Sequence, residues 1–222
     1  MARKIRYFNR FTSQNQITKA TLSEDFFDEW FSKLMPTPLN LRYNIFVMHS
    51  SCIYHLLTHK DCPLRYRILY ASAPTWQARY AALLFGSTKY RFSEMALGDK
   101  SKTIRDNFIL NLLIDLDKVS SPPNETLNPL FKYLKPKILT FKESKKNTDD
   151  LSRNEKMLIS AFRIASNDGV CGLVHPESLI RGISHWIISN NLEEQIKEFI
   201  AWENSLPGFK FADFSNFHKR MY

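Results

Sequence analysis

The most regular feature of this sequence is an apolar stripe with helical spacing between residues 104 and 116. Its members recur three and four positions apart: Ile104, Phe108, Ile109, Leu112, Leu113 and Leu116. Such residues lie along one face of an α-helix, and other elements must cover that face. The stripe predicts a buried helix in a packed domain, and the 44% apolar content of this 222-residue chain is enough to build one.

Similar stripes predict helices elsewhere, within residues 23–34, 41–62, 75–85, 152–166, 176–189 and 191–200. Ser152 and Glu155 form a capping-box pattern, and Pro176 suits a first helical turn. Residues 65–70 fit either a helix or a strand. The stretch Lys137-Ile-Leu-Thr-Phe-Lys142 instead favours a short strand. We therefore expect a mainly α fold, in which a helical N-terminal domain precedes a small strand-helix-helix segment.

The domain organisation is indicated by the stretch Ser-Ser-Pro-Pro-Asn at 120–124, because paired prolines cannot continue a helix. We place a linker there. The expected parts are a basic N-terminal arm (1–20), a helical domain (21–119), the linker (120–129), a strand-helix-helix domain that binds DNA (130–206) and an aromatic C-terminal tail (207–222).

Composition and termini exclude several classes of protein. No apolar run approaches the roughly 18 residues that a transmembrane helix needs. The basic N-terminus is not followed by the apolar stretch of a secretory signal. Three cysteines (52, 62 and 171) form an odd, sparse set unlike a disulfide scaffold. We expect a cytoplasmic protein with no membrane partner.

The net charge of +9 is concentrated in three blocks, residues 1–20, 60–110 and 130–146, while the intervening stretches are slightly acidic. One interpretation is that these blocks are solvated faces and a loose tail. We favour the other, a surface that binds phosphate groups, because the charge is segregated along the chain. Within the first block Arg3, Arg6 and Arg10 alternate with aromatic residues, which suits either stacking on nucleic acid or docking on the core.

Residues 91–116 resemble the helix-turn-helix motif of bacterial DNA-binding proteins. Gly98 falls at the turn, and Thr103-Ile104 falls where that motif carries a Thr-Val or Thr-Ile pair. The resemblance implies that Lys102, Thr103 and Arg105 project from the recognition helix toward DNA. Glu94 departs from the motif, which has a small residue there. The alternative is an ordinary helical hairpin.

Residues 137–190 resemble the ribbon-helix-helix transcriptional regulators of conjugative plasmids. In that family a strand pairs with its copy in a dimer, and the resulting ribbon enters the major groove. The resemblance implies that the strand beginning at Lys137 turns Thr140 and Lys142 toward DNA, and that Ser178, at the start of the second helix, lies beside a phosphate. The strand-to-helix loop here is longer than that of the family. The alternative is a helical domain with one edge strand.

Catalysis and metal binding find less support in the sequence. Histidines and cysteines gather between His49 and Cys62, but they lack the paired ligand spacing of structural zinc sites, and Cys52 also fits an apolar stripe. Asp115 and Asp117 form an isolated acidic pair, and no phosphate-binding loop or nucleophile motif is present. We therefore expect no enzyme activity, cofactor, metal site or small-molecule substrate.

Together these observations predict a sequence-specific double-stranded DNA-binding protein, a bacterial or mobile-element transcriptional regulator that acts as a homodimer. The alternative is a non-catalytic helical adaptor or accessory subunit of a nucleoprotein or defence complex. A metal-dependent nuclease is a further, minor option.

Overall fold

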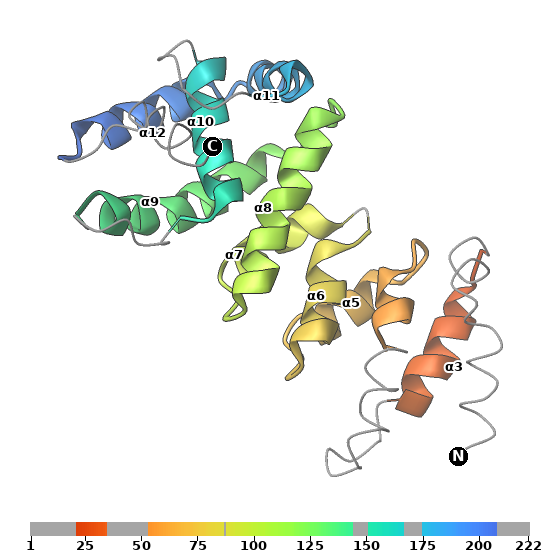
Figure 1. Ribbon diagram of the computed structural model, residues 1–222. Coiled ribbons are helices and arrows are strands. Elements are labelled where there is room, and N and C mark those ends of the chain that lie inside the picture. The colour runs from red at the N-terminus through yellow and green to blue at the C-terminus, as the bar shows by residue number, and fades with distance from the viewer. Residues whose placement is uncertain (1–20, 35–52, 87, 144–150, 167–174, 208–222) are drawn as a thin grey trace, which may run out of the picture. The chain divides into compact units, whose positions relative to one another are not determined.

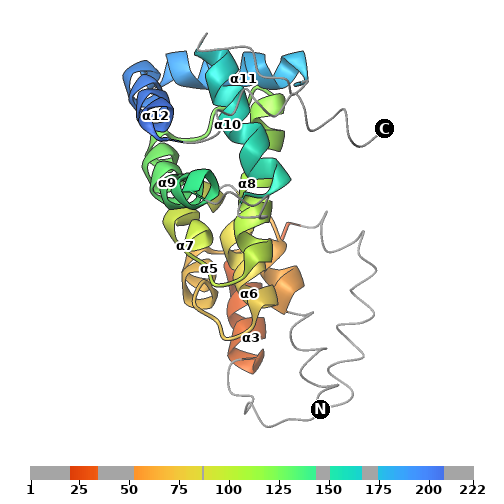
Figure 2. The same cartoon turned by 60° about the vertical axis from the view of Figure 1, so that its left-hand side comes forward.

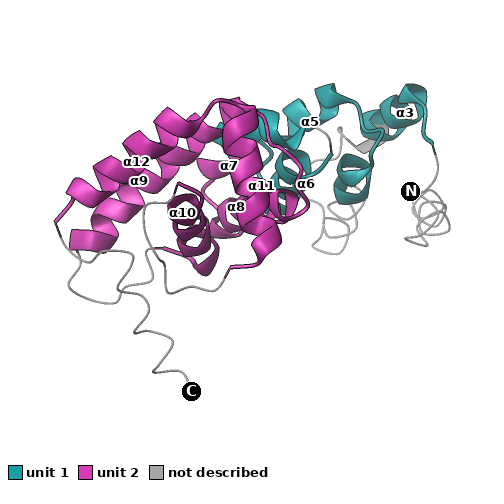
Figure 3. Ribbon diagram, turned by 90° about the horizontal axis from the view of Figure 1, so that it is seen from above, with its two compact units in different colours: residues 1–95 teal, residues 96–222 magenta. Residues whose placement is uncertain are grey.

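The computed structural model describes residues 21–34, 53–86, 88–143, 151–166 and 175–207, and each regular element in these ranges is a helix (Figure 1). The mainly α fold is thereby confirmed. The chain divides into two compact units, residues 1–95 and 96–222 (Figure 3). This division lies well before the linker that the prolines suggested. None of the helices in these ranges combines the length and the apolar character that crossing a bilayer requires.

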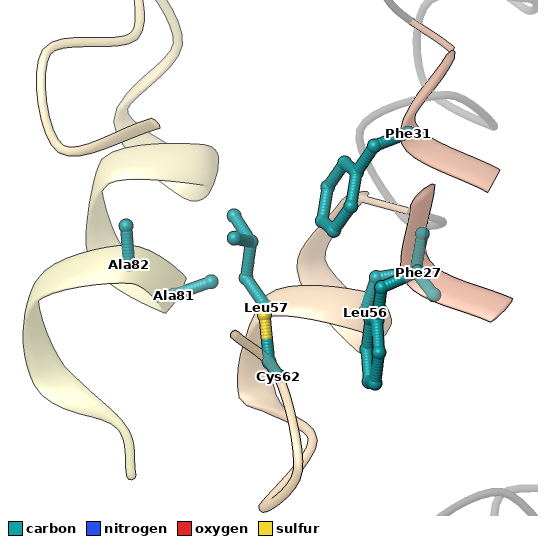
Figure 4. Packing of buried hydrophobic residues seen from close by; sticks show 7 residues of the cluster. All are labelled: Phe27, Phe31, Leu56, Leu57, Cys62, Ala81 and Ala82. Atoms are coloured by element: carbon teal, nitrogen blue, oxygen red, sulfur yellow. The ribbon is translucent and has the colours of Figure 1, made fainter. Parts of the chain in front are cut away.

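The first unit is a set of short helices around a small apolar core. Its elements are α3 (Glu24–Leu34), a helix over residues 53–58, α5 (Leu64–Tyr70), α6 (Trp76–Leu84) and the 3-10 helix η1 (Lys89–Phe92). Residues 65–70 are thus helical. Side chains from three of these helical segments and the turn at Cys62 meet in the core (Figure 4): Phe27, Phe31, Leu56, Leu57, Cys62, Ala81 and Ala82. Burial raises the pKa of the Cys62 thiol to about 11, so the thiol stays protonated at neutral pH.

Helix α3 forms for reasons that are local in the sequence. The Ser23 hydroxyl accepts a hydrogen bond from the Phe26 amide at 3.3 Å, as an N-cap does. Phe27 and Phe31, one turn apart, are fully buried and their rings stack. Phe31 also stacks on Tyr66 of α5 with 4.0 Å between ring centroids. Aromatic packing therefore joins α3 to α5.

The second unit is a larger helical assembly that includes the predicted amphipathic helix. It begins at Ala96, within the short helix α7 (Ser93–Leu97). Its further elements are α8 (Lys102–Asp117), the 3-10 helix η2 (Asn124–Thr126), α9 (Leu127–Glu143), α10 (Arg153–Ala165), α11 (Glu177–Ser189) and α12 (Glu193–Ser205). All six apolar residues of the predicted stripe on α8 are buried. Helix α8 packs against α10 and α11, and α10 also packs against α11 (Figure 2).

The segment predicted as a linker is held along α11. Asp117, at the end of α8, accepts a hydrogen bond from the Ser178 hydroxyl, and the Trp186 indole N–H donates to the Pro122 carbonyl at 2.6 Å. The Ser121 hydroxyl lies 3.1 Å from Nδ1 of His185. Because Trp186 is fully buried, its hydrogen bond ties this segment to the core of the second unit.

The predicted strand at 137–142 is wrong, because these residues form the last turns of helix α9. The buried residues of α9 continue one helical stripe from Leu130 through Leu134 to Ile138. Leu139, which the strand would have turned inward, is 37% exposed, and Lys142, which it would have turned outward, is 7% exposed. No strand occurs among the residues that the structure describes, so the ribbon of a ribbon-helix-helix protein is not formed here.

Helix α9 contains Pro136 in its interior, where a proline has no amide hydrogen to donate. The helix nevertheless continues, because Phe131 stacks on Phe199 of α12 at 4.2 Å and Leu134 and Ile138 are fully buried. Tertiary packing therefore outweighs the local cost of the proline.

Candidate nucleic-acid interface

The turn before α8 is fixed by hydrogen bonds on both sides of Asp99. Its carboxylate accepts from the Ser101 amide at 2.7 Å, and its carbonyl accepts from Nη1 of Arg105 at 2.5 Å. Ile104, one residue before Arg105, is fully buried. The start of α8 is therefore anchored by the buried Ile104 and by a turn that cannot easily rearrange.

Lys102 and Thr103 occupy the first turn of α8, and both side chains are exposed. Neither side chain is engaged by another residue within the described part of the chain. The first turn contains no acidic residue, although Asp99 in the preceding turn already satisfies the Ser101 amide. Lys100 is exposed beside them. An ammonium and a hydroxyl at this position suit contacts to phosphate or to base edges.

Arg105 differs from these two residues because its guanidinium turns back into the protein. It donates from Nη1 to the Asp99 carbonyl, and its charge opposes the rise that burial causes in the pKa of Tyr133 in α9. The side chain is half-buried. Arg105, a predicted DNA contact, is thus engaged in an internal hydrogen bond, whereas the side chains of Lys102 and Thr103 are exposed.

The three residues assigned to the ribbon are placed on α9. Lys137 donates from Nζ to Oε1 of the buried Glu155 at 2.6 Å. Thr140 is exposed, and its hydroxyl donates to the Pro136 carbonyl one turn earlier at 3.0 Å. Lys142 is buried, and its Nζ lies 2.7 Å from Oε1 of Glu203 in α12. None of the three is arranged as the exposed, alternating face of a strand.

Lys142 belongs to a buried charged cluster that joins three helices. Glu203 is 1% exposed and pairs with Lys142 from α9 and with Arg163 from α10. Arg163 also donates to the Asn204 side chain at 2.7 Å. A buried carboxylate must be compensated by cations or hydrogen bonds, and here two cations surround it. The charge of Lys142 is therefore used inside the protein.

Ser178 lies in the first turn of α11 but is not positioned to bind a phosphate. Its hydroxyl donates to a carboxylate oxygen of Asp117, and the same turn carries Glu177. Two carboxylates near a helix N-terminus repel an anion such as a phosphate. The phosphate contact expected at Ser178 is thus replaced by an internal hydrogen bond.

The remaining residues considered for binding or catalysis divide into two groups. Arg3, Arg6 and Arg10, like His49 and Cys52, lie outside the described residues. His59 is described, and it is 2% exposed, accepts a hydrogen bond from the Asp61 amide at Nδ1 and packs against Phe27. His59 is therefore part of the core of the first unit. Among the described residues, no three His, Cys, Asp or Glu side chains are grouped so that they could hold a metal ion.

Sequence reasoning missed the contact that Tyr133 and Glu155 make between α9 and the start of α10. Glu155 was identified only as half of a capping box, and that role is confirmed because Ser152 and Glu155 bond reciprocally. Tyr133 and Lys137, spaced one helical turn apart, both donate to Glu155. The spacing of Tyr133 and Lys137, four residues apart, could have indicated that they share a partner. That inference requires knowing that residues 133–137 are helical, because only a helix brings positions i and i+4 to one face.

Comparison of the chain with protein-family models, with curated proteins and with solved structures found no match.

Proposed function

We propose that this protein binds double-stranded DNA in a sequence-specific manner, as a cytoplasmic transcriptional regulator of a bacterium or mobile element, through the start of α8. The observation that carries this proposal is the pair of exposed, unengaged side chains Lys102 and Thr103 on the first turn of a helix that follows a tight turn. In helix-turn-helix proteins the N-terminal residues of the recognition helix contact base edges. Lys102 supplies a cation for phosphate or guanine, and Thr103 supplies a hydroxyl and a methyl group.

The overall charge is in keeping with a polyanionic partner. The full chain carries 31 basic and 22 acidic residues. Contacts to phosphate release bound counterions, so the affinity should fall steeply with salt. Because two of the predicted contacts, Arg105 and Lys142, are internal, the phosphate contacts of the second unit are assigned to Lys100 and Lys102.

We propose that the protein binds DNA as a homodimer, because helix-turn-helix proteins recognise two half-sites with two copies of the motif. Leu110 and Ile114, one turn apart on α8, are 38% and 39% exposed and offer an apolar contact for a second copy. Analytical ultracentrifugation on DNA of one and two half-sites tests this assignment. A single protein copy bound at saturation on every duplex would contradict it.

The test of DNA binding uses the full chain and a duplex that it enriches from a randomised pool. Fluorescence anisotropy compares that duplex with a scrambled one at two salt concentrations. We expect the enriched duplex to bind roughly 10³-fold more tightly. Replacing Lys102 and Thr103 together (Lys102→Gln, Thr103→Ala) should lower the specific affinity at least about tenfold and reduce the salt slope by about one.

A matched control is Lys197→Gln, which removes an exposed lysine of α12 that pairs with Glu194. The control should leave both affinity and slope unchanged. Equal affinity for the two duplexes would contradict sequence-specific recognition, and an absence of binding to either would contradict DNA binding altogether.

A second candidate function, a non-catalytic adaptor, is favoured by one observation on the first unit. Ile68, Leu69 and Trp76 are 57%, 47% and 45% exposed, which is high for large apolar side chains that lie near one another in the sequence. Such side chains suit a protein partner. Leu69→Ser separates the two functions, since it should leave DNA binding intact in a regulator and should abolish complex formation in an adaptor.

A further inference from the structure

The start of helix α11 is joined to helix α10 by a hydrogen bond between two side chains. Nε2 of His175 lies 2.7 Å from the hydroxyl oxygen of Ser160. Ser160 belongs to α10, and His175 immediately precedes Pro176, the N-cap of α11. The two helices also pack against each other. The imidazole therefore ties the residue before α11 to the middle of α10.

The two sides of this contact differ in exposure. Ser160 is fully buried, so its hydroxyl depends on a partner within the protein. His175 is only half-buried, and Pro176 beside it is exposed. The imidazole can therefore leave Ser160 and reach solvent without the unfolding of either helix.

The second ring nitrogen of His175 favours the neutral form of the ring. Nδ1 is buried, and no group of the described residues forms a hydrogen bond with it. A neutral imidazole carries one proton, which it can place on Nε2, so that Nδ1 stays a bare acceptor. An imidazolium carries a proton on both nitrogens, and its Nδ1–H would be a buried charged donor without an acceptor. The site therefore fits the neutral ring and disfavours the charged one.

The charges of the surrounding helices do not compensate a protonated His175. Within the described part of the chain His175 forms no ion pair, and burial alone lowers its pKa below the ordinary value of 6.5. The charged side chains of these helices that flank the site have other partners: Lys156 lies over the ring of Phe141, Arg163 pairs with Glu203, Glu177 pairs with Arg181, and Asp117 accepts from Ser178.

We propose that His175 is a pH-sensitive latch between α10 and the start of α11. The neutral imidazole closes the latch by binding Ser160. A protonated ring leaves Ser160 for solvent, and the first turn of α11 then loses this attachment to α10. The rest of α11 stays in place, because Leu179, Ile183 and Trp186 are buried. The latch does not depend on the proposed DNA binding.

The direction of the switch follows from the environment of the ring. Because the pKa of His175 is held below 6.5, the latch is closed at neutral pH. It opens as the pH falls through the pKa of the folded protein. Proton NMR of the full chain measures that midpoint, and His175→Gln assigns the signal because it removes it. We expect a midpoint below pH 6.5.

Amide hydrogen exchange, corrected for the intrinsic effect of pH, then reports the opening. The amides of Leu179 and Ile180 donate to the Pro176 carbonyl in the first turn of α11. Between pH 7.5 and one unit below the measured midpoint, we expect their protection in wild type to fall at least about tenfold, with α12 unchanged.

Three variants separate the latch from other effects of acid. In His175→Gln the protection of the first turn should not depend on pH, because glutamine does not titrate. Ser160→Ala removes the partner of the ring, so protection should be low at both pH values. His185→Gln is the matched control, since it removes an exposed histidine of the same helix that contacts Ser121 and Ser189. This control should respond to pH as wild type does.

Three results would overturn the inference. The first is a midpoint for His175 at or above pH 6.5. The second is protection of Leu179 and Ile180 that is the same at both pH values in wild type. The third is an equal fall in protection in His175→Gln and wild type, which would assign the opening to another group.

Discussion

The carbonyl oxygen of Leu116 in α8 lies so close to Gly182 in α11 that a Cβ at position 182 would be 1.7 Å from it. Backbones approach this closely only where a glycine leaves room, and such contacts bring Cα–H groups against carbonyl oxygens. Gly182 is buried and in the middle of its helix, where glycine otherwise costs stability. The packing of α8 on α11 therefore depends on the absence of a side chain at this position.

Gly182→Ala should destabilise the protein by about 3 kcal/mol, because the added methyl group forces the two helices apart. Urea unfolding followed by circular dichroism measures the change in the free energy of unfolding. Ser189→Ala, at an exposed position of the same helix, is the matched control and should change stability by less than about 0.5 kcal/mol. Equal stability of Gly182→Ala and wild type would contradict the close approach.

Val119 is expected to be a site where glycine stabilises the protein. Its φ is 58°, in the left-handed region that a β-branched residue rarely adopts. It follows α8 in a Schellman motif, in which the Ser120 amide donates to the Asp115 carbonyl and the Val119 amide to the Leu116 carbonyl. Val119→Gly should raise the free energy of unfolding by about 1 kcal/mol.

The matching position after α11 provides the control. Asn191 has a φ of 54° in the same kind of motif, and asparagine tolerates that region. Asn191→Gly should therefore change stability little. A gain of similar size at both positions would show that backbone strain at Val119 is not the cause.

Lys142→Met should destabilise the second unit by about 3 kcal/mol, because it leaves the buried Glu203 with a single cation. Lys197→Met removes an exposed lysine that pairs with Glu194, and such pairs contribute little. Thermal unfolding of both variants makes the comparison. Similar small losses in the two variants would contradict the burial of the Lys142 charge.

The stability of the second unit should depend on pH through His175. Its Nε2 lies 2.7 Å from the buried Ser160 hydroxyl, and burial lowers its pKa below the ordinary value of 6.5. Between the folded and unfolded pKa values the unfolded chain binds more protons, so stability rises with pH there. The stability that the neutral His175 contributes is fully present above pH 6.5 and is lost as the pH falls below that value.

Urea unfolding at pH 7.5 and pH 5 measures this dependence. His175→Gln, which cannot titrate, should show a smaller loss of stability at the lower pH than wild type. An equal loss in the two proteins would assign the acid sensitivity to other groups.

Local sequence signals were enough to predict several helices of the second unit. The stripe on α8 and the capping box of α10 involve residues within one or a few turns of one another, so their spacing alone specifies the helices. The exposure of Lys102 and Thr103 followed from the same spacing, because they fall on the polar side of that stripe. These features needed no knowledge of distant residues.

Only the tertiary structure decided the remainder. Residues 137–142 are compatible locally with strand or helix, and packing of α9 against α12 selects the helix. The carboxylates that pair with internal cations lie far away in the sequence, as Glu203 does from Lys142. Exposed and internal cations look alike in a sequence. Whether a lysine or arginine meets solvent or a buried carboxylate depends on which helices the fold brings together.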